Sequence, residues 1–374
     1  MKTVVAVGAG ILTALGDLND TWTGLINGRS GLVFRKINGF DNEWPIGLID
    51  GLPETLGTNK RLDALFDRLF QTLPDIPKNT TLLCATTKGA ADELLEQGNH
   101  DLGQPWQIAR QLAERLSIKG KIATVSAACA SGTIATIQGA MCIASGECEN
   151  VLVVGVDLVS RFVLSGFASL KALSVSGCKP FDVRRDGLSL GEGAGWILLS
   201  SVESFRQSSW SLTAQLVSWG IAGDASHITA PCRRASGLIA ALKQVIHRSE
   251  VPIGGINAHG TGTLYNDAME LLAFKKVCDA PVPICSIKGS IGHCLGASGV
   301  IEIALSLKSL KNNILPPTVG LVKPADDTML LSGDTSLRLC YPTVLSCNSG
   351  FGGINAAILL AQQIDLNLSR SSTS

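Results

Sequence analysis

The sequence has no excess of charge of either sign. Its 374 residues include 31 Lys and Arg against 31 Asp and Glu, and charged residues make up only 17% of the chain. A nucleic-acid-binding protein normally carries a basic excess, so the balance argues against that class. Low net charge combined with 45% apolar residues also argues against a disordered chain. So little charged surface favours a globular protein with a large buried interface.

The chain also lacks two kinds of local pattern. No run of 18 consecutive apolar residues occurs, so we predict no membrane-spanning helix. The eleven cysteines form no Cys-x-x-Cys pair and no Cys/His ladder, so we predict no metal site. Many cysteines without a pairing framework are typical of a reducing compartment, and we expect a cytoplasmic protein in which most of them are buried.

The amino-terminal apolar run admits three interpretations. A signal peptide fits poorly, because the run carries one charge, is broken by Gly8 and Gly10, and has no convincing cleavage site. A dinucleotide-binding turn also fits poorly, because Thr13 stands where the third glycine of the fingerprint belongs. We favour a strand that ends in a glycine turn.

Short apolar runs alternate with helical patterns along the rest of the chain, which predicts an α/β fold. Several of the runs are apolar throughout, as in strands buried on both faces. The expected strands cover 3–7, 81–85, 121–125, 151–156, 195–199, 255–258, 344–346 and 356–360. The expected helices cover 61–73, 105–116, 131–144, 237–248, 267–277 and 299–312. We expect two comparable halves, 1–205 and 206–364, followed by a polar tail at 365–374.

Cys129 is the first candidate for chemistry. The segment 126–133 (SAACASGT) follows an apolar strand and opens a long helical pattern, which places Cys129 at a strand-to-helix turn. The positive end of a helix dipole stabilises a thiolate, the nucleophilic form of cysteine. A buried structural cysteine is the alternative, but the small neighbours leave room for a substrate beside the sulfur.

Two histidines lie in glycine-rich loops farther along the chain. His259 ends an apolar strand and enters the loop 257–263 (NAHGTGT), and His293 follows Lys288 in the loop 286–299 (SIKGSIGHCLGASG). Taken alone, Lys288 reads as a solvated surface residue. A third glycine-rich segment, 348–355 (NSGFGGIN), frees backbone N–H groups for an oxyanion or forms a hairpin turn.

Together these segments contain a complete set of groups for acyl transfer: a nucleophile, two imidazoles and N–H donors. One cysteine with histidine also admits a papain-like hydrolase. The local signature of that class around the cysteine is missing, and Lys288 and the second histidine would have no role in it.

The motifs resemble those of the β-ketoacyl-acyl carrier protein synthases, the condensing enzymes of the thiolase superfamily. The similarity runs from Val4 to about Leu360 and includes 179–187 (KPFDVRRDG) and 191–195 (GEGAG). The order of nucleophile, histidine, lysine, histidine and Gly-Phe-Gly-Gly loop is also that of the family. The resemblance implies the five-layered αβαβα thiolase fold, with two pseudo-symmetric halves, in a protein that is usually a dimer.

The resemblance also implies roles for the candidate residues. Cys129 would accept an acyl group from the phosphopantetheine arm of an acyl carrier protein, with the N–H groups of Cys129 and Phe351 as oxyanion hole. His259 and His293 would hydrogen-bond the carbonyl of a malonyl-carrier thioester and promote its decarboxylation, because two N–H donors stabilise an enolate oxygen. Lys288 and Glu270 would keep this network oriented.

The substrate would be bound along a tunnel. Thr261 and Thr263 would line it beside the pantetheine arm, and Phe351, with Gly352 beside it, would form the gate to the acyl pocket. No cofactor or metal of the protein's own is implied, because the phosphopantetheine arrives on the carrier. Two catalytic histidines are typical of the elongating branch of the family.

Several departures indicate a divergent member. The chain is short, and the region from about 50 to 120, which contains the family's cap, is compressed. No Phe precedes Gly350, Leu264-Tyr265 replaces a pair that usually contains Pro, and Cys294 and Ser298 are untypical. We therefore expect a specialised type II fatty-acid or polyketide system, such as aryl-polyene assembly.

The main rival hypothesis is a chain-length-factor-like subunit that pairs with a full-length synthase and has little or no condensing activity. Such partners commonly lose the nucleophile, so Cys129 favours an enzyme, whereas the compressed cap and altered gate loop favour a partner. An enzyme would form a homodimer and a partner a heterodimer. Thiolase-type chemistry on coenzyme A and hydrolysis remain as further alternatives.

Overall fold

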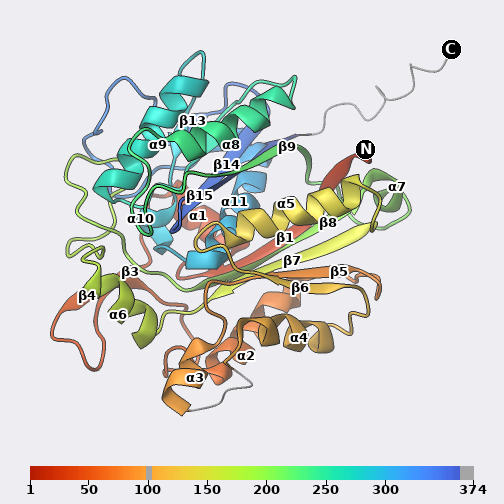
Figure 1. Ribbon diagram of the computed structural model, residues 1–374, viewed down its shortest axis with the longest axis horizontal. Helices are drawn as coiled ribbons and strands as arrows, with labels where there is room; N and C mark the ends of the chain where they lie inside the picture. Colours follow the sequence, from red (N-terminus) through yellow and green to blue (C-terminus); the bar gives the residue numbers. More distant parts are fainter. Residues whose placement is uncertain (98–102, 363–374) are drawn as a thin grey trace.

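A computed structural model describes residues 1–97 and 103–362, and the expected tail at 365–374 lies outside these ranges. Its centre is an 11-stranded sheet with helices on both sides and between its two halves (Figure 1). No helix in the described part of the chain is both long and apolar enough to cross a membrane.

The strands fall into two halves with the same order of pairings. In the first half β6 (Ile122–Val125), β5 (Thr81–Ala85) and β7 (Asn150–Asp157) are parallel, and β8 (Gly193–Ser201) and β1 (Val4–Thr13) continue antiparallel. In the second half β11 (Ile284–Cys285), β10 (Ile256–Asn257) and β14 (Thr343–Gly350) are parallel, and β15 (Ile354–Ala361) and β9 (Ala214–Gly223) continue antiparallel. The halves join where Val4 pairs with Leu216. This repeated pairing confirms the expected pseudo-symmetry.

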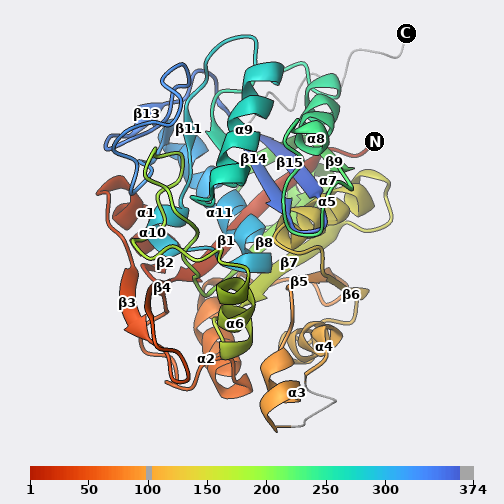
Figure 2. The same cartoon turned by 60° about the vertical axis from the view of Figure 1, so that its left-hand side comes forward.

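Helices complete five layers. Helices α5 (Ser131–Ala144) and α11 (Ser298–Asn312) pack against each other between the two half-sheets. Helices α2 (Asn59–Leu69) and α4 (Pro105–Arg115) cover the outer face of the first half, and α8 (Ser236–His247) and α9 (Leu264–Val277) cover that of the second (Figures 1 and 2). The expected αβαβα arrangement is therefore confirmed.

Burial on both faces explains the continuous apolar strands. In β7, Val151 and Val153 contact the central helices, whereas Leu152 and Val154 contact the outer layer. Successive side chains of a strand point to opposite faces, so a strand between two helical layers needs apolar residues at every position. This pattern is what made β5, β7, β8 and β15 predictable.

Several strands and helices were not predicted from the sequence. Strand β9 joins the halves but alternates buried and partly exposed residues. Helices α1 (Leu18–Ile26) and α6 (Arg161–Ser169) were also missed, as was the hairpin of β3 (Leu32–Lys36) and β4 (Glu43–Gly47). The helix expected over 61–73 ends at Leu69 and continues as a 3-10 turn, Phe70–Thr72.

The expected boundary near residue 205 falls in the connection between β8 and β9, where the short helix α7 (Val202–Phe205) ends. This boundary stays a prediction, because α11, from the second half of the chain, packs against β8 as well as β14.

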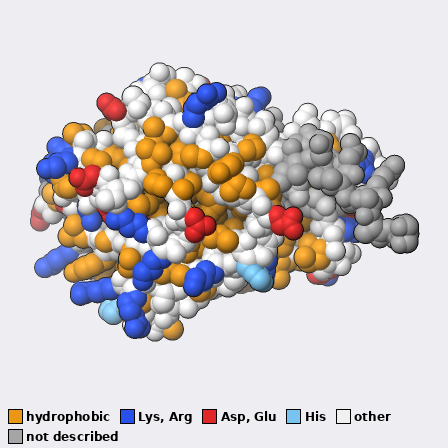
Figure 3. All heavy atoms as spheres, turned by 90° about the horizontal axis from the view of Figure 1, so that it is seen from above, with side chains coloured by type: hydrophobic (Ala, Val, Ile, Leu, Met, Phe, Trp, Pro, Cys, Tyr) orange, Lys and Arg blue, Asp and Glu red, His pale blue; other side chains and the backbone are white. Residues whose placement is uncertain are grey.

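Over the outer layer that contains α8 and α9, apolar side chains gather at the centre of the surface, with basic side chains mainly on one side of them (Figure 3).

Candidate active site

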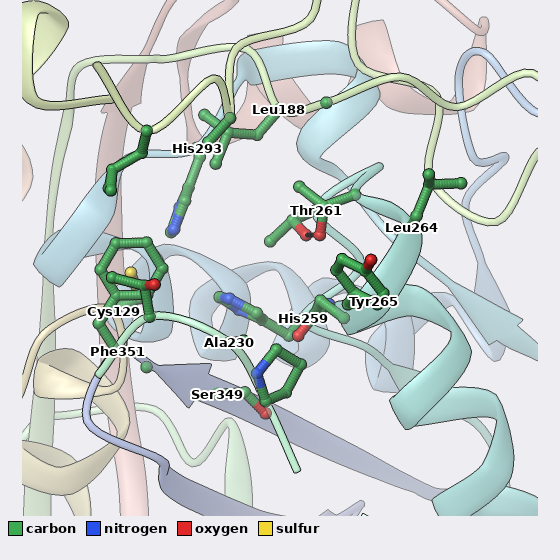
Figure 4. A pocket seen from close by; sticks show the side chains of 18 of the residues that line it. Cys129, Leu188, Ala230, His259, Thr261, Leu264, Tyr265, His293, Ser349 and Phe351 are labelled. Carbon is green, nitrogen blue, oxygen red and sulfur yellow. Dashed lines mark hydrogen bonds between the residues drawn. The ribbon is translucent and has the colours of Figure 1, made fainter. Parts of the chain in front are cut away.

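The structure brings the three central candidates together. Cys129 follows β6 in the first half of the chain. In the second half, His259 follows β10 and His293 lies in the loop before α11. The Cys129 sulfur and one ring nitrogen of each histidine lie within 4.8 Å of one another. Figure 4 shows the three side chains around one cleft.

Cys129 lies in a strained turn at the amino end of α5. Ala128 has a φ of +49°, an uncommon conformation for a residue with a side chain, and α5 begins at Ser131. Burial raises the pKa of the Cys129 thiol to about 12, against the opposing effect of the Lys288 charge. We expected the helix end to stabilise a thiolate. Burial in the cleft opposes that effect, and stabilisation of a thiolate by the helix end stays a prediction.

The hydrogen bonds around His259 define its tautomer. Its Nδ1 lies 3.0 Å from Asn348 Nδ2 and 3.3 Å from Lys288 Nζ. Both neighbours are donors, so Nδ1 accepts and the ring hydrogen lies on Nε2. Burial and the Lys288 charge hold the pKa of His259 well below its usual 6.5, so the ring is neutral at neutral pH.

His293 lies next to His259, with ring centroids 5.2 Å apart and the rings nearly perpendicular at 83°. Its backbone N–H donates to the Ser189 carbonyl at 2.7 Å, and its Nδ1 lies 3.0 Å from Ser298 Oγ. Burial and Lys288 lower the pKa of His293 well below 6.5 as well. The cleft therefore contains two neutral imidazoles side by side.

Lys288 is not the surface residue that its sequence context alone suggested. It is buried and pairs with the carboxylate of Glu302, and it also donates to the His259 carbonyl. The other Glu302 oxygen accepts from Asn348 Nδ2 at 2.7 Å. Burial raises the pKa of Glu302, and the Lys288 charge opposes the rise.

Sequence reasoning missed Glu302 and gave Asn348 no role. The available signal for Glu302 was its position as the one acidic residue of the helix segment 298–312. A buried charge in an apolar helix needs a partner, and Lys288 supplies it.

Glu270 contacts the backbone of the His259 loop, and its expected role in orienting the network stays a prediction. Its carboxylate accepts the backbone N–H groups of His259 and Gly260, each at 2.7 Å, and the Asn266 side chain at 2.8 Å. Burial and neighbouring Asp267 raise the pKa of Glu270 to about 8. Glu270 thus fixes the backbone of the His259 loop, whereas Glu302 is the acid that pairs with Lys288.

The cleft above these residues has a volume of about 370 Å³. Thr261 and Thr263 line it, with their hydroxyls 2.9 Å apart. Phe351 also lines it, is 36% exposed, and packs against Phe167 at 5.7 Å between ring centroids. Gly352 does not line the cleft: it lies in the adjoining turn with a φ of +84°.

The backbone N–H of Phe351 lies close to the Cys129 sulfur and lowers the pKa of its thiol. The Gly-Phe-Gly-Gly segment forms the turn of the β14–β15 hairpin, which confirms the hairpin interpretation, whereas the donor interpretation stays a prediction. An N–H group at this point can stabilise an oxyanion that forms on a carbonyl attached to the sulfur.

Cys129, His259 and His293 have the spacing of metal ligands. Their protonation does not suit that role. A metal on His259 Nε2 would move the ring hydrogen to Nδ1, which faces the donors of Asn348 and Lys288. The cluster fits chemistry that uses N–H donors better than it fits a metal centre.

Comparisons with known proteins agree with this arrangement. The family models for the β-ketoacyl synthase amino-terminal and carboxy-terminal domains match residues 78–204 and 213–322, together more than half of the chain. A 3-oxoacyl-[acyl-carrier-protein] synthase 2 of Rhizobium meliloti is 33% identical over 267 residues, which span 67% of this chain and 63% of that relative. One of Vibrio harveyi is 29% identical over 96% of this chain and 98% of its own length.

Solved structures show the same fold. A ketosynthase in complex with its chain length factor from Xenorhabdus doucetiae contains a chain that is 25% identical, with a TM-score of 0.81, over 97% of this chain and 98% of that chain. A β-ketoacyl synthase from Burkholderia phymatum is 24% identical, with a TM-score of 0.85, over 97% of this chain and all of that chain. The chain belongs to the β-ketoacyl synthase family.

Proposed function

We propose that this protein is a β-ketoacyl-acyl carrier protein synthase that joins an acyl group to a malonyl unit by decarboxylative Claisen condensation. The observation that carries the proposal is the group of Cys129 and two neutral histidines within 4.8 Å of one another in one cleft. A nucleophile next to two N–H donors serves both acylation and enolate formation.

In the first step the Cys129 sulfur attacks the carbonyl of an acyl-carrier thioester. A new carbon–sulfur bond forms to Cys129, the bond to the pantetheine sulfur breaks, and the thiol proton of Cys129 ends on the departing pantetheine thiol. The N–H groups of Cys129 and Phe351 stabilise the oxyanion. Because burial raises the pKa of the Cys129 thiol, the proton leaves the sulfur during the attack on the thioester.

In the second step a malonyl-carrier thioester occupies the cleft. Its carboxylate leaves as carbon dioxide, and the electron pair forms an enolate whose oxygen accepts N–H bonds from His259 and His293. The enolate carbon attacks the acyl carbonyl on Cys129, the carbon–sulfur bond to Cys129 breaks, and the released thiolate takes up a proton from solvent. Lys288, Glu302 and Glu270 act on this step through the position of His259.

The acyl carrier protein is the proposed partner and supplies the phosphopantetheine, so the chain needs no cofactor of its own. The names of its relatives include an acyl carrier protein, which supports this partner. All eleven cysteines are free and none is paired, which supports work in the cytoplasm. The similarity to a ketosynthase that pairs with a chain length factor supports a specialised type II fatty-acid or polyketide pathway, for example aryl-polyene assembly.

Intact-protein mass spectrometry after incubation with an acyl-carrier thioester tests the proposal. We expect one acyl adduct on the wild type and on Cys340→Ala, which removes an exposed cysteine, and no adduct on Cys129→Ala. Added malonyl-carrier thioester should then discharge the adduct as a β-ketoacyl-carrier product. An adduct that persists in Cys129→Ala would overturn the assignment of the nucleophile.

A chain-length-factor-like subunit is the second candidate, favoured by the same structural similarity. In that case the isolated chain would remain unacylated, and acylation would occur only on a co-purified partner synthase. The intact set of Cys129, His259, Lys288 and His293 favours the enzyme.

A further inference from the structure

The side chain of Ser298 contacts His293, and the resemblance assigns no role to this contact. It is the first residue of α11, is 3% exposed, and places its hydroxyl 3.0 Å from Nδ1 of His293. In residues 1–97 and 103–362 the Ser298 hydroxyl has no other hydrogen-bond partner. The contact is therefore a buried pair in which each group depends on the other.

The direction of this hydrogen bond can be decided by asking which polar hydrogen would be buried without an acceptor in each of the two possible arrangements. If Nδ1 carried the ring hydrogen and donated to Ser298, the serine hydrogen would be buried without an acceptor. If Ser298 donates to Nδ1, the serine hydrogen is paired, and the ring hydrogen moves to Nε2. A buried polar hydrogen without a partner is costly, so the second arrangement is favoured.

The surrounding loop holds this contact in place. The Gly296 N–H donates to Asp157 at 2.7 Å, the His293 N–H donates to Ser189, and Leu295 has a φ of +49°. Asp157 is itself anchored by the hydroxyl of Thr86 at 2.9 Å. The backbone from His293 to Ser298 is thus fixed at several points, so the orientation of the ring depends on its own side-chain partner.

We infer that Ser298 is a positioning residue that holds His293 as the Nε2–H tautomer, so that its N–H points into the cleft. His259 is held in the same tautomer by Asn348 and Lys288. Two independent sets of donors thus leave an N–H group on each of two neighbouring rings, and two such donors stabilise an enolate oxygen that lies between them. The kinetic consequence rests on the proposed function, whereas the tautomer does not.

The test compares Ser298→Ala with Ser290→Ala. Ser290 lies in the same segment, 286–299, and is also buried, but its hydroxyl has no hydrogen-bond partner among the described residues, so it controls for the loss of a buried hydroxyl. Imidazole ¹⁵N NMR is practical because the chain has five histidines. The His293 resonances, assigned by loss in His293→Ala, should show Nε2–H in the wild type and in Ser290→Ala. In Ser298→Ala they should shift towards the other tautomer.

The kinetic readout separates the two steps of the reaction. Ser298→Ala should slow malonyl-carrier decarboxylation by about 10- to 100-fold, less than the roughly 100- to 1,000-fold cost of removing an oxyanion-hole donor. Acylation of Cys129 should stay within about twofold of wild type, because that step uses backbone donors.

An unchanged tautomer in Ser298→Ala would overturn the inference, and so would equal losses in acylation and decarboxylation, which would indicate a purely structural role. If wild type forms no acyl adduct, the proposed function fails, and the NMR result still decides whether Ser298 sets the tautomer.

Discussion

The buried pair of Lys288 and Glu302 allows a quantitative prediction for Glu302→Gln. Both side chains are about 1% exposed, so the substitution leaves an ammonium group in the interior without a counter-charge. Removing one partner of a buried pair typically costs roughly 3–5 kcal/mol. The Gln oxygen still accepts from Asn348 or Lys288, so we expect a loss near the lower end, about 3 kcal/mol in the free energy of unfolding.

Urea denaturation followed by tryptophan fluorescence measures this loss. The matched control is Glu114→Gln, which breaks an exposed pair with Arg110 and should cost no more than about 0.5 kcal/mol. Adding Lys288→Met to Glu302→Gln removes the unpaired charge and should restore at least half of the lost stability, but not the condensing activity. A Glu302→Gln variant within about 0.5 kcal/mol of wild type would refute the reasoning, as would a double variant no more stable than the single one.

Two further predictions concern pH and the central helices. The lowered pKa values of His259 and His293 mean that the unfolded chain binds protons first as the pH falls below 6.5, so stability should decrease there by about 1.4 kcal/mol per pH unit for each histidine. The raised pKa of Glu270 changes stability in the opposite direction over this range, so urea denaturation at a series of pH values compares wild type with His293→Gln, and equal slopes below pH 6.5 would contradict the prediction. In Gly132→Ala the new Cβ would lie 2.7 Å from the Val300 backbone nitrogen, so we expect a loss of about 1–3 kcal/mol and slower acylation. Gly166→Ala in α6 meets nothing within 4 Å and should be neutral or stabilising by up to about 1 kcal/mol; equal effects of the two would argue against the close helix contact.

The sequence predicted those parts of the site that depend on local pattern. The strand, turn and helix around Cys129 are encoded by neighbouring residues, and α5 has the predicted bounds, Ser131–Ala144. The loops of His259 and His293 carry similar local signals in their glycines, accompanied by threonines in the first loop and serines in the second. Continuous apolar runs located the doubly buried strands for the same reason.

The remaining features depend on contacts between distant segments. Glu302 is informative only when Lys288 is known to face it, and Asn348 only when Glu302 and His259 are known to flank it. The burial that raises the pKa of the Cys129 thiol could not be predicted, because the helix end is visible in the sequence, whereas the depth of burial is set by loops from both halves. Strand β9 has an ordinary alternating pattern, and its place between the halves follows from pairing with β1 and β15.

The position of α11 in the central layer has a consequence for synthesis on the ribosome. By the time β8 has emerged, the first half-sheet and α5 are complete, but the apolar face of α5 that α11 and β15 will cover is still exposed. The covering segments are made last, and exposed apolar surface on a nascent chain favours aggregation and chaperone binding. We therefore expect a chain truncated after Phe205 to aggregate or to bind chaperones. We also expect the acyl-accepting cleft to form only when translation is nearly complete.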